Sequence, residues 1–475
     1  MGLFVAHILI LKKCKIMNFE DIKSIYFVGA GGIGMSALLR YYLATGVPVG
    51  GYDKTPSELT KTLEAEGAQL HYEDDPDLIP ETFRDKAHTL VVYTPAIPAD
   101  HKEMAWFRAE GFEIQKRAYV LGLLTRSAKG LCVAGTHGKT TTTSMLAHLL
   151  HESKVGCNAF LGGITKNYGT NYLLDENSDY VVIEADEFDR SFHHLRPFAT
   201  AITSADPDHL DIYGTEAAYL ESFSHYTSLV QPGGALVIEE SVKIDLKLQE
   251  GVTYYTYGRT SGDFHAENLR IGGGRIVFDL ISPLGNVTDV ELGVPVSINI
   301  DNGIAAMALA QLAGANAEEI RQAMKTFAGV GRRFDFKIKT DKVVLLSDYA
   351  HHPEEIRQSI LSLREVFEGR KIATIFQPHL YSRTNDFYRE FAEALSLADE
   401  VYLTEIYPAR ELPIPGVTSQ LIYDAMSDGV KKQLVEKDNV LELVKQEEFD
   451  LLVILGAGDL DNQMGEIAEV LSARM

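Results

Sequence analysis

The amino-acid sequence predicts an α/β protein of three domains, in which helices cover mainly parallel sheets. Strand-like apolar runs alternate with helical stretches along the chain, which is typical of parallel sheets flanked by helices. The chain has 475 residues, and at about 100–200 residues per domain this length suits three domains. The composition, 45% hydrophobic and 23% charged, excludes a disordered or collagen-like chain.

The domain limits follow from these apolar runs and from the breaks between them. Breaks near residues 124–129 and 329–332 predict domains of residues 17–126, 127–330 and 331–475. The first and third domains are expected to be Rossmann-like, and the central one to be a P-loop ATPase-like domain with a parallel sheet. The predicted strands are residues 24–28, 89–93, 130–134, 180–184, 342–347, 371–376 and 451–455.

Residues 1–16 precede the recognisable globular pattern, which opens at Met17. Their apolar run comes before Lys12, Lys13 and Lys15, whereas a signal peptide has its positive charge first. We therefore expect residues 1–16 to be an appendage or a mis-called start without a function.

The charge balance bears on possible partners. Lys and Arg number 44 against 67 Asp and Glu, which gives a net charge of −23. Such a chain has no broad attraction for phosphate backbones or anionic membranes, so neither nucleic acid nor a membrane is expected as a partner. No apolar run reaches the roughly 18–20 residues of a membrane helix. Three sparse cysteines, Cys14, Cys132 and Cys157, indicate a reducing compartment, and we expect the cytoplasm.

The first of two glycine loops is GAGGIG at residues 29–34, between a predicted strand at 25–28 and a predicted helix at 35–43. In this context the glycines let the backbone approach a diphosphate, and the helix N-terminus supplies N–H groups. Asp53 ends the next predicted strand and could accept a hydrogen bond from a ribose hydroxyl. A tight structural turn and a nicotinamide cofactor site remain alternatives, because the motif alone does not distinguish NAD from another nucleotide diphosphate.

The second glycine loop is GTHGKTTT at residues 135–142, between a predicted strand at 131–134 and a predicted helix at 143–150. A standard P-loop has a glycine where this chain has Val133, so the loop is a shortened variant. Its amides can cradle a phosphate, Lys139 can reach the terminal phosphates, and the Thr140 hydroxyl can bind Mg²⁺.

Carboxylates follow the predicted strand 180–184. Glu184 lies at the tip of this strand, with Asp186 and Glu187 just beyond, and a carboxylate in such a place beside a P-loop is a natural Mg²⁺ ligand. For Glu187 we expect only a solvated acidic turn. His209, which follows a predicted strand at 200–203, could be a second metal ligand, although a single histidine there is more often structural.

The presence of both loops in one chain indicates a combined function. A P-loop ATPase has no need of the first loop, and a nicotinamide enzyme has no need of the second. We therefore expect one nucleotide to carry a substrate and another to donate a phosphoryl group, which is the logic of an ATP-driven ligation.

The C-terminal third gathers polar side chains after predicted strands. Arg332 and Arg333 at the second break could close over a γ-phosphate or could be a surface basic pair. DYAHHP at residues 348–353 and FQPHLYSRT at 376–384 follow two strands, and strand ends of a parallel sheet converge where ligands bind. Arg383 suits the carboxylate of an amino acid. The glycine turn at 456–459 is expected to be structural.

Six strings together resemble the Mur ligases, and among them the branch of UDP-N-acetylmuramate:L-alanine ligases. They are GAGGIGMS (29–36), GTHGKTTTT (135–143), EADEFDRSF (184–192), GRRFDF (331–336), DYAHHP and FQPHLYSRT. The resemblance runs from about Asp21 to the end of the chain, and the first and last strings favour the alanine-adding branch. It implies a first domain for the UDP group, a second for ATP and Mg²⁺, and a third that closes over them and binds the amino acid.

The resemblance also implies roles for particular residues. UDP-sugar binding falls to Gly31, Gly32, Ile33, Gly34, Met35 and Ser36, with Asp53 beside them. ATP binding falls to Gly135, Thr136, His137, Gly138, Lys139, Thr140, Thr141, Asn299, Asn302, Arg332, Arg333 and Asp348. Metal binding falls to Thr140, Glu184 and His209, alanine binding to Tyr349, His351, His379 and Arg383, and catalysis to Lys139, His209, Arg333 and His351.

The chain departs from the family pattern at a few positions. Ile298 stands where the family often has histidine, which weakens the adenine assignment of Asn299, and Leu380 stands where it often has arginine. No lysine lies between His209 and Val242, so the carbamylated lysine of several other Mur ligases is not expected.

The implied reaction joins ATP, UDP-N-acetylmuramate and L-alanine into an amide, with release of ADP and phosphate. The γ-phosphoryl group would first form an acyl phosphate, and Mg²⁺, expected as two ions, would help Lys139 and the closing arginine to offset the repulsion of the two anions. His351 or His379 would accept the proton of the amine. We expect a monomer or a weak homodimer.

Three other functions remain open at this point. They are a recycling ligase that adds a ready-made tripeptide to the same UDP-sugar, a regulator that uses ATP as a switch, and a nicotinamide dehydrogenase built on the first loop.

Overall fold

The computed structural model describes residues 22–409 and 411–474, without the side chains of residues 210 and 211. It divides into two compact units, Met1–Glu267 with Asp279–Val290 and Asn302–Phe327, and Asn268–Phe278 with Glu291–Asp301 and Ala328–Met475. Each unit is described by itself. The predicted appendage at 1–16, Met17 and Cys14 lie outside the described residues. Of the helices described, none combines the length and the apolar character needed to cross a membrane.

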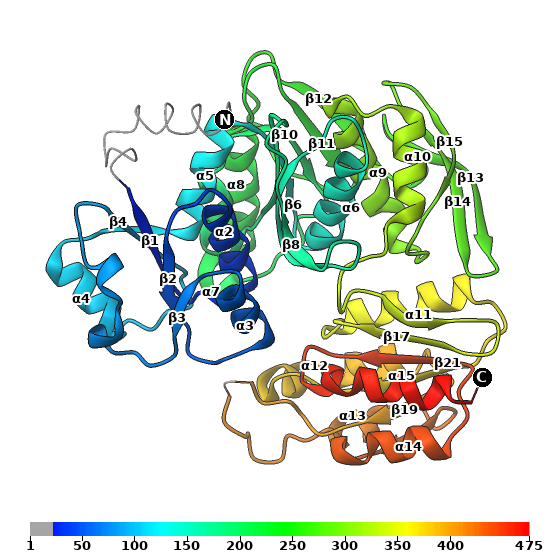
Figure 1. Cartoon of the computed structure of the whole chain (residues 1–475). Helices are drawn as coiled ribbons and strands as arrows, with labels where there is room; N and C mark the ends of the chain where they lie inside the picture. The colour runs from blue at the N-terminus through cyan, green and yellow to red at the C-terminus, as the bar shows by residue number, and fades with distance from the viewer. Residues whose placement is uncertain (1–21, 410, 475) are drawn as a thin grey trace. The chain divides into compact units, whose positions relative to one another are not determined.

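The first sheet has five parallel strands in the order β3-β2-β1-β4-β5 (Figure 1). This order places β1, whose five residues are all buried, at the centre, and it is the doubly wound arrangement of the predicted Rossmann-like fold. The first glycine loop therefore leaves the carboxyl end of β1, where the strand order of the sheet reverses. The strands are β1 Ser24–Val28, β2 Val49–Tyr52, β3 Gln69–His71, β4 Thr89–Tyr93 and β5 Glu113–Lys116, and the helices are α2 Ile33–Ala44, α3 Glu58–Ala65, α4 Lys102–Glu110 and α5 Arg117–Ser127, with short 3₁₀ turns η2 Pro76–Leu78 and η3 Glu81–Phe83.

The second sheet has seven strands in the order β12-β11-β10-β6-β9-β7-β8, of which the β7–β8 pair is antiparallel and the other described pairs are parallel. Because β6 lies between β10 and β9, the second glycine loop, the acidic segment after β9 and the residues after β10 all reach one edge of this sheet. The strands are β6 Lys129–Ala134, β7 Asn158–Thr165, β8 Thr170–Leu173, β9 Tyr180–Ala185, β10 Pro197–Ile202, β11 Ala235–Glu239 and β12 Thr253–Tyr257, and the helices are α6 Lys139–His151, η4 Phe188–His194, α7 Leu210–Tyr213 and α8 Glu216–Thr227.

The first two sheets share one hydrophobic core. A single cluster of buried side chains runs from Ile25 and Leu38 through Leu121 to Val181 and Tyr226. Helix α2, which follows the first glycine loop, packs against β7 and β8 of the second sheet. The two glycine loops therefore belong to one packed unit.

A third, small sheet has the order β13-β14-β15, and its strands were not predicted from the sequence. They are β13 His265–Gly272, β14 Arg275–Ile281 and β15 Val287–Glu291, and they are followed by α9 Ile298–Ala313 and α10 Ala317–Thr326. Helix α10 packs against α6 (Figure 1). The boundary between the two units falls within this sheet and within α9.

The fourth sheet, in the second unit, has the order β16-β17-β21-β18-β19-β20, and only β16 runs antiparallel to its neighbour. The ends of β17, β21 and β18 lie side by side, so the polar segments after β17 and β18 flank the glycine turn after β21. The strands are β16 Asp335–Lys339, β17 Val344–Asp348, β18 Ile372–Phe376, β19 Glu400–Leu403, β20 Lys431–Leu434 and β21 Leu451–Leu455, and the helices are α11 Pro353–Val366, α12 Tyr381–Leu395, α13 Gln420–Ala425, η5 Lys437–Asn439, α14 Val440–Gln446, η6 Leu460–Gln463 and α15 Met464–Ser472.

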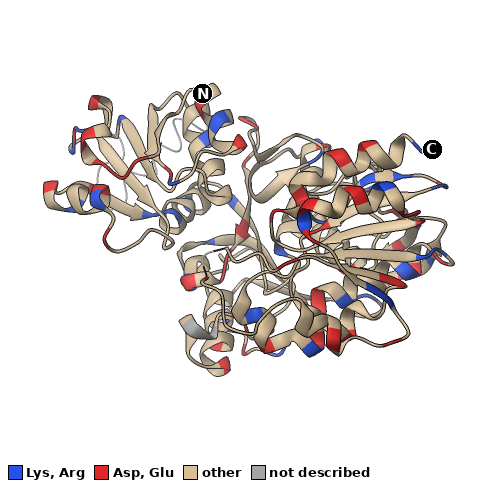
Figure 2. Cartoon of the chain, turned by 90° about the horizontal axis from the view of Figure 1, so that it is seen from below, with Lys and Arg blue, Asp and Glu red and all other residues tan. Residues whose placement is uncertain are grey.

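The predicted α/β fold is confirmed, and its predicted strands are close to the observed ones. The runs 24–28, 89–93 and 451–455 match β1, β4 and β21 to the residue, and the other predicted strands differ by one to three residues at one or both ends. Helix α6 begins at Lys139, four residues before the predicted start, because Gly138 and not the threonines forms its N-cap. Charged residues are scattered over the helices, strands and loops of both units (Figure 2).

A buried polar cluster lies on the first sheet, among β1, β3 and α4. The Tyr26 hydroxyl donates to Glu103 Oε2 at 2.8 Å and lies 2.6 Å from His71 Nε2. Both Tyr26 and Glu103 have 0% of their surface exposed. Burial, together with the charges of Asp74 and Asp75, raises the pKa of Glu103 to about 8, against the hydrogen bond from Tyr26. The Glu103 carboxyl is therefore protonated in the folded protein at neutral pH.

This cluster predicts a pH-dependent stability. Because the pKa of Glu103 is about 8 in the folded protein and near 4.5 when unfolded, its contribution is complete below about pH 4.5 and is lost as the pH rises through 8. Glu103→Gln keeps the shape but removes the titration, so the fall in Tm between pH 6 and pH 9 should become smaller. Calorimetry at several pH values measures this effect, with Glu110→Gln, exposed on the same helix, as the control; identical pH slopes in all three proteins would contradict the assignment.

Candidate active site

The second glycine loop has the backbone of an anion cradle. Gly135 and Gly138 have φ values of 143° and 80°, a region that favours glycine. A Cβ on Gly135 would collide with Thr203, and one on Gly138 would lie 2.5 Å from Asn302 Oδ1. Gly138 caps α6 without any side-chain hydrogen bond, so the N-terminus of α6 presents N–H groups that can donate hydrogen bonds to an anion.

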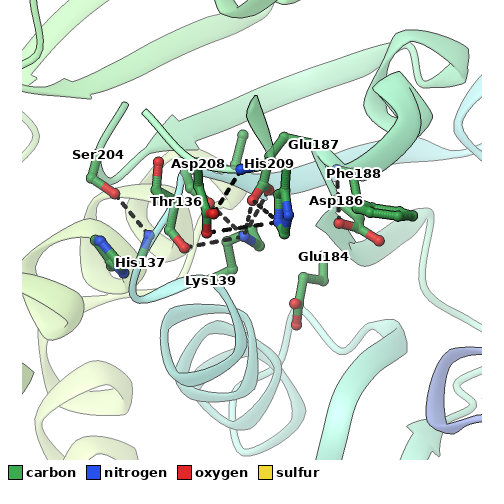
Figure 3. Close-up of polar contacts among 12 residues, drawn as sticks. Thr136, His137, Lys139, Glu184, Asp186, Glu187, Phe188, Ser204, Asp208 and His209 are labelled. Atoms are coloured by element: carbon green, nitrogen blue, oxygen red, sulfur yellow. Dashed lines mark hydrogen bonds and ion pairs between the residues drawn. The ribbon is translucent and has the colours of Figure 1, made fainter. Parts of the chain in front are cut away.

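Lys139 lies over this loop and is held by a buried carboxylate (Figure 3). Its Nζ is 2.7 Å from Glu187 Oε2 and 2.9 Å from Oε1, and it donates to the Gly135 carbonyl at 2.6 Å. Glu187 is only 2% exposed. The expectation that Glu187 belongs to a solvated acidic turn is therefore wrong: the turn after β9 folds inward, and the carboxylate becomes the partner of Lys139. Burial raises the pKa of Glu187, whereas the nearby Lys139 charge lowers it.

Thr140 and Glu184 are brought together as predicted for a metal site. The Thr140 hydroxyl donates to Glu184 Oε1 at 3.2 Å, and Gly162 on β7 leaves the space for this carboxylate, since a Cβ there would collide with it. Within residues 22–409 and 411–474, no three His, Cys, Asp or Glu side chains form a ready-made metal cage. Mg²⁺ suits such an incomplete set, because it is usually held by one or two carboxylates plus substrate phosphates and water.

His209 lies with Glu187 and not with Glu184. Its Nε2 is 3.9 Å from Glu187 Oε1, and its ring packs edge-on against Phe188 at 5.1 Å (Figure 3). His209 has a φ of 52°, an uncommon value for a residue with a side chain. The structure thus places His209 beside the lysine–carboxylate pair.

The remaining predicted residues of the second loop differ in their exposure to solvent. The Thr136 hydroxyl donates to the Asp206 carbonyl at 2.7 Å. The His137 amide donates to Ser204 Oγ at 2.8 Å (Figure 3). The His137 side chain is half-exposed, and Thr141 is half-buried in the first turn of α6. These bonds fasten the loop to the segment after β10.

The two predicted adenine residues are buried. The Asn302 side chain accepts a hydrogen bond from Thr142 Oγ1 at 3.2 Å, against the second loop. The Asn299 amide donates to the Val294 carbonyl at 3.1 Å. The two residues are 7% and 3% exposed, so each offers little side-chain surface in this structure.

The first glycine loop is braced by Asp53. The Gly31 amide donates to Asp53 Oδ2 at 2.7 Å, and the other oxygen of Asp53 accepts from Thr55. Gly32 and Ile33 are exposed, and Gly34 is half-buried. Asp53 thus has a structural partner in addition to the ribose hydroxyl predicted from the sequence.

Met35 and Ser36 lie beneath this loop. Met35 is 2% exposed and belongs to the shared core, and Ser36 is 0% exposed. The Ser36 hydroxyl donates to the Ile33 carbonyl at 2.8 Å, and Asn171 on β8 donates to both groups, at 2.9 and 2.6 Å. Their side chains therefore support the loop from below, and Asn171 ties the loop to the second sheet.

The two arginines at the start of the second unit's main segment have different surroundings. Arg332, with a φ of 63°, donates to the Gly458 carbonyl at 2.9 Å and lies 3.4 Å from Asp461. Both guanidinium groups lie over the Tyr349 ring, each at 4.9 Å from its centre. The glycine turn at 456–459, expected to be structural, is thus an acceptor for Arg332, which leaves Arg333 as the better candidate for a phosphate.

Asp348 is a buried carboxyl at the end of β17. It accepts hydrogen bonds from Ser359 and from the Phe334 amide. Burial raises its pKa to about 6, although Ser359 and the charge of Arg333 oppose the shift. Asp348 therefore joins the arginine segment to α11.

The predicted alanine residues lie close together in the second unit. The rings of His351 and His379 are 5.9 Å apart, Tyr349 is 5.1 Å from His351, and Arg383 Nη1 is 3.3 Å from His379 Nδ1. Two residues that the sequence did not single out complete the group. Tyr407 stacks on His379 at 5.8 Å, and Glu355 lies 3.5 Å from His351 Nδ1.

His351 is half-buried beside Glu355. Burial lowers its pKa, and the charge of Glu355 works in the opposite direction. A neutral imidazole at physiological pH is what a general base requires.

These features define a class of protein. A P-loop-like cradle with its lysine, a hydroxyl and carboxylate suited to Mg²⁺, and a second glycine loop in the same packed unit are typical of an enzyme that uses a nucleotide triphosphate on a second nucleotide-linked substrate.

Family models match the chain in three places. The Mur ligase family, catalytic domain matches residues 24–129, the Mur ligase middle domain matches 133–310, and the Mur ligase, glutamate ligase domain matches 332–458. The chain belongs to the Mur ligase family.

The chain is similar to relatives that are named alike. It is 62% identical over 458 residues to the UDP-N-acetylmuramate--L-alanine ligase of Phocaeicola vulgatus, with 96% of this chain and 100% of the relative covered. It is 58% identical to that of Parabacteroides distasonis, with 96% and 98% covered. The crystal structure of the Thermotoga maritima UDP-N-acetylmuramate-alanine ligase has a TM-score of 0.80 at 29% identity, covering 95% of this chain and 100% of that one. The resemblance to the alanine-adding branch is confirmed.

The Lys139–Glu187 pair predicts linked effects on activity and stability. Lys139→Ala should abolish phosphate release and leave the Glu187 carboxylate buried without its partner, which destabilises by about 3 kcal/mol. Loss of Lys139 also raises the pKa of Glu187, so the fall in Tm should be larger at pH 8 than at pH 5.5. In the double variant Lys139→Ala/Glu187→Gln the Tm should recover while phosphate release stays absent, as thermal unfolding and a phosphate assay will measure. A Tm loss that is independent of pH and of Glu187 would refute the coupling.

The His351–Glu355 contact predicts a shifted pH profile. Because Glu355 raises the pKa of His351, Glu355→Gln should lower that pKa further, and the acid limb of kcat/KM for the amino acid should move to lower pH. Glu354→Gln, an exposed neighbour on the same helix, is the control. If the limb does not move, the proton is taken by another group, such as His379.

Proposed function

We propose that this chain catalyses the ATP-dependent ligation of L-alanine to the lactyl carboxylate of UDP-N-acetylmuramate, a step of peptidoglycan precursor synthesis in the cytoplasm. The observation that carries this proposal is the 62% identity, over 96% of the chain, to a relative named for that activity. The two glycine loops in one packed unit support it, because the reaction needs both a nucleotide-linked sugar and a phosphoryl donor.

The first step makes the carboxylate reactive. A carboxylate is a poor acyl donor because its oxide is a poor leaving group. One carboxylate oxygen attacks the γ-phosphorus, the bond to the β–γ bridging oxygen breaks, and ADP leaves an acyl phosphate behind. The two reacting groups are both anions, so Lys139 and Arg333 would offset their repulsion. Lys139 must first exchange the Glu187 carboxylate for a phosphate oxygen.

The second step forms the amide. The alanine nitrogen attacks the carbonyl carbon, a tetrahedral intermediate forms, and phosphate leaves with the bonding electron pair. His351 would accept the proton that the amine must lose, with Tyr349 and His379 beside it, and Arg383 would bind the alanine carboxylate.

Thr140 and Glu184 would hold Mg²⁺, and His209, beside Glu187, would take part if a second ion binds. When bound, Mg²⁺ neutralises phosphate charge and acts as a Lewis acid. Asn299 and Asn302 would lie near the adenine and Asp348 near the phosphates, and Gly31–Gly34 with Asp53 would meet the UDP group. We also propose that the protein acts as a monomer or a weak homodimer.

A phosphate-release assay with each substrate omitted in turn tests the proposed function. Release should require ATP, UDP-N-acetylmuramate and L-alanine together, because the acyl phosphate forms only on the sugar carboxylate and is consumed by the amine. A second arm replaces alanine with a peptidoglycan tripeptide. Full release without the UDP-sugar would contradict a ligase and favour an ATP-driven switch, and a preference for the tripeptide would indicate a recycling ligase.

A further inference from the structure

Arg117 lies against the first glycine loop. It is the first residue of α5, directly after β5, and so it stands at the carboxyl edge of the first sheet, the edge at which ligands bind. A Cβ built on Gly34, the last glycine of the loop, would lie 2.5 Å from Arg117 Nη1 and 3.0 Å from Cζ. The absence of a side chain at position 34 thus lets the guanidinium group lie close against the loop.

Another nitrogen of the same guanidinium faces the acidic segment that follows β9. Arg117 Nη2 is 3.6 Å from Asp186 Oδ2, and Asp186 lies two residues beyond Glu184. Arg117, Glu184 and Asp186 line one small cavity, together with apolar side chains of α5 and η4. Arg117 thus lies between the part of the chain that would hold a diphosphate and the part that would hold Mg²⁺ and ATP.

The ion pair with Asp186 is not a strong one. Its distance of 3.6 Å is longer than the roughly 2.7–2.9 Å of a charge-assisted hydrogen bond. The Asp186 side chain is 38% exposed, and pairs of this kind contribute little to stability because water screens them. A guanidinium carries five N–H donors in a planar fork, so this contact leaves donors for a ligand.

We infer that Arg117 binds the diphosphate of the UDP-sugar, at the point where the ligand leaves the first glycine loop and extends toward the second. This inference rests on the proposed function. Arginine matches two phosphate oxygens at once, which the main-chain amides of the loop cannot do from a single residue. In a chain of net charge −23, a local cation at the loop supplies the attraction that the molecule as a whole lacks.

Binding of UDP, measured by calorimetry without metal or ATP, tests the inference. UDP has the diphosphate but neither the N-acetylmuramyl sugar nor the lactyl carboxylate. Its binding therefore reports contacts with the diphosphate separately from contacts with those two groups. Arg117→Met should weaken UDP binding by about 10- to 100-fold, as expected for the loss of hydrogen bonds to a charged group. Arg117→Lys should retain part of the affinity, since it keeps the charge without the fork. Lys116→Met, at the neighbouring residue that pairs with Asp189, is the matched control and should bind UDP as the wild type does.

Two further measurements separate binding from a structural role. Uridine, which has no phosphate, should compete with the UDP-sugar equally well in the wild type and in Arg117→Met. In Arg117→Met the KM for the UDP-sugar should rise, whereas the KM for ATP should not. Asp186→Asn should bind UDP at least as tightly as the wild type, because Arg117 loses a competing partner. Equal losses for uridine and UDP, or a loss in Asp186→Asn that matches that in Arg117→Met, would overturn the inference and leave Arg117 as a structural residue.

The outcomes also separate this inference from the proposed function. If the wild type binds UDP-N-acetylmuramate and Arg117→Met binds it equally well, only the inference fails. If the wild type binds neither that sugar nor UDP, the proposed function fails and the inference with it. If Arg117→Met does not fold, the comparison of Arg117→Lys with Lys116→Met decides in its place, because unchanged UDP affinity in Arg117→Lys would contradict a two-point contact.

Discussion

The buried ion pair between Lys139 and Glu187 is the interaction on which the nucleotide site depends. It keeps the lysine folded over its own loop, where the Gly135 carbonyl also accepts from it. A charged group buried in this way is stable only while its partner stays in place. If ATP binds here as proposed, Lys139 would exchange this carboxylate for a phosphate oxygen, and the buried Glu187 would lose its partner.

Local contacts account for most of what the sequence could predict. The buried strands are uninterrupted apolar runs, and both glycine loops lie directly between a strand and a helix, so their places followed from periodicity and turn chemistry alone. The strands β13–β15 were not predicted because exposed polar residues interrupt their apolar pattern. In His265–Gly272, for example, four consecutive residues are exposed. From its sequence pattern alone, without the strands that pair with it, that stretch does not differ from a loop.

Two of the errors and omissions at the site depend on contacts between distant parts of the chain. Glu187 follows a strand among other acidic residues, and only the approach of Lys139, 48 residues earlier, distinguishes it from a solvated turn. Arg117 also stands directly after a strand, a position that could have marked it, but its contact with Gly34 spans the first domain. The contact of Glu355 with His351 is local, because His351 lies just before α11 and Glu355 lies in the first turn of that helix.

The single core beneath the first two sheets has a consequence for small-molecule design. Two weak binders, one for each glycine loop, would meet anchor points whose separation is already fixed by packing. Joining them with a linker of matched length would turn the second contact into an intramolecular one, with an effective concentration in the millimolar range for a short linker. A linked compound would then gain affinity without any contact that its two halves lack.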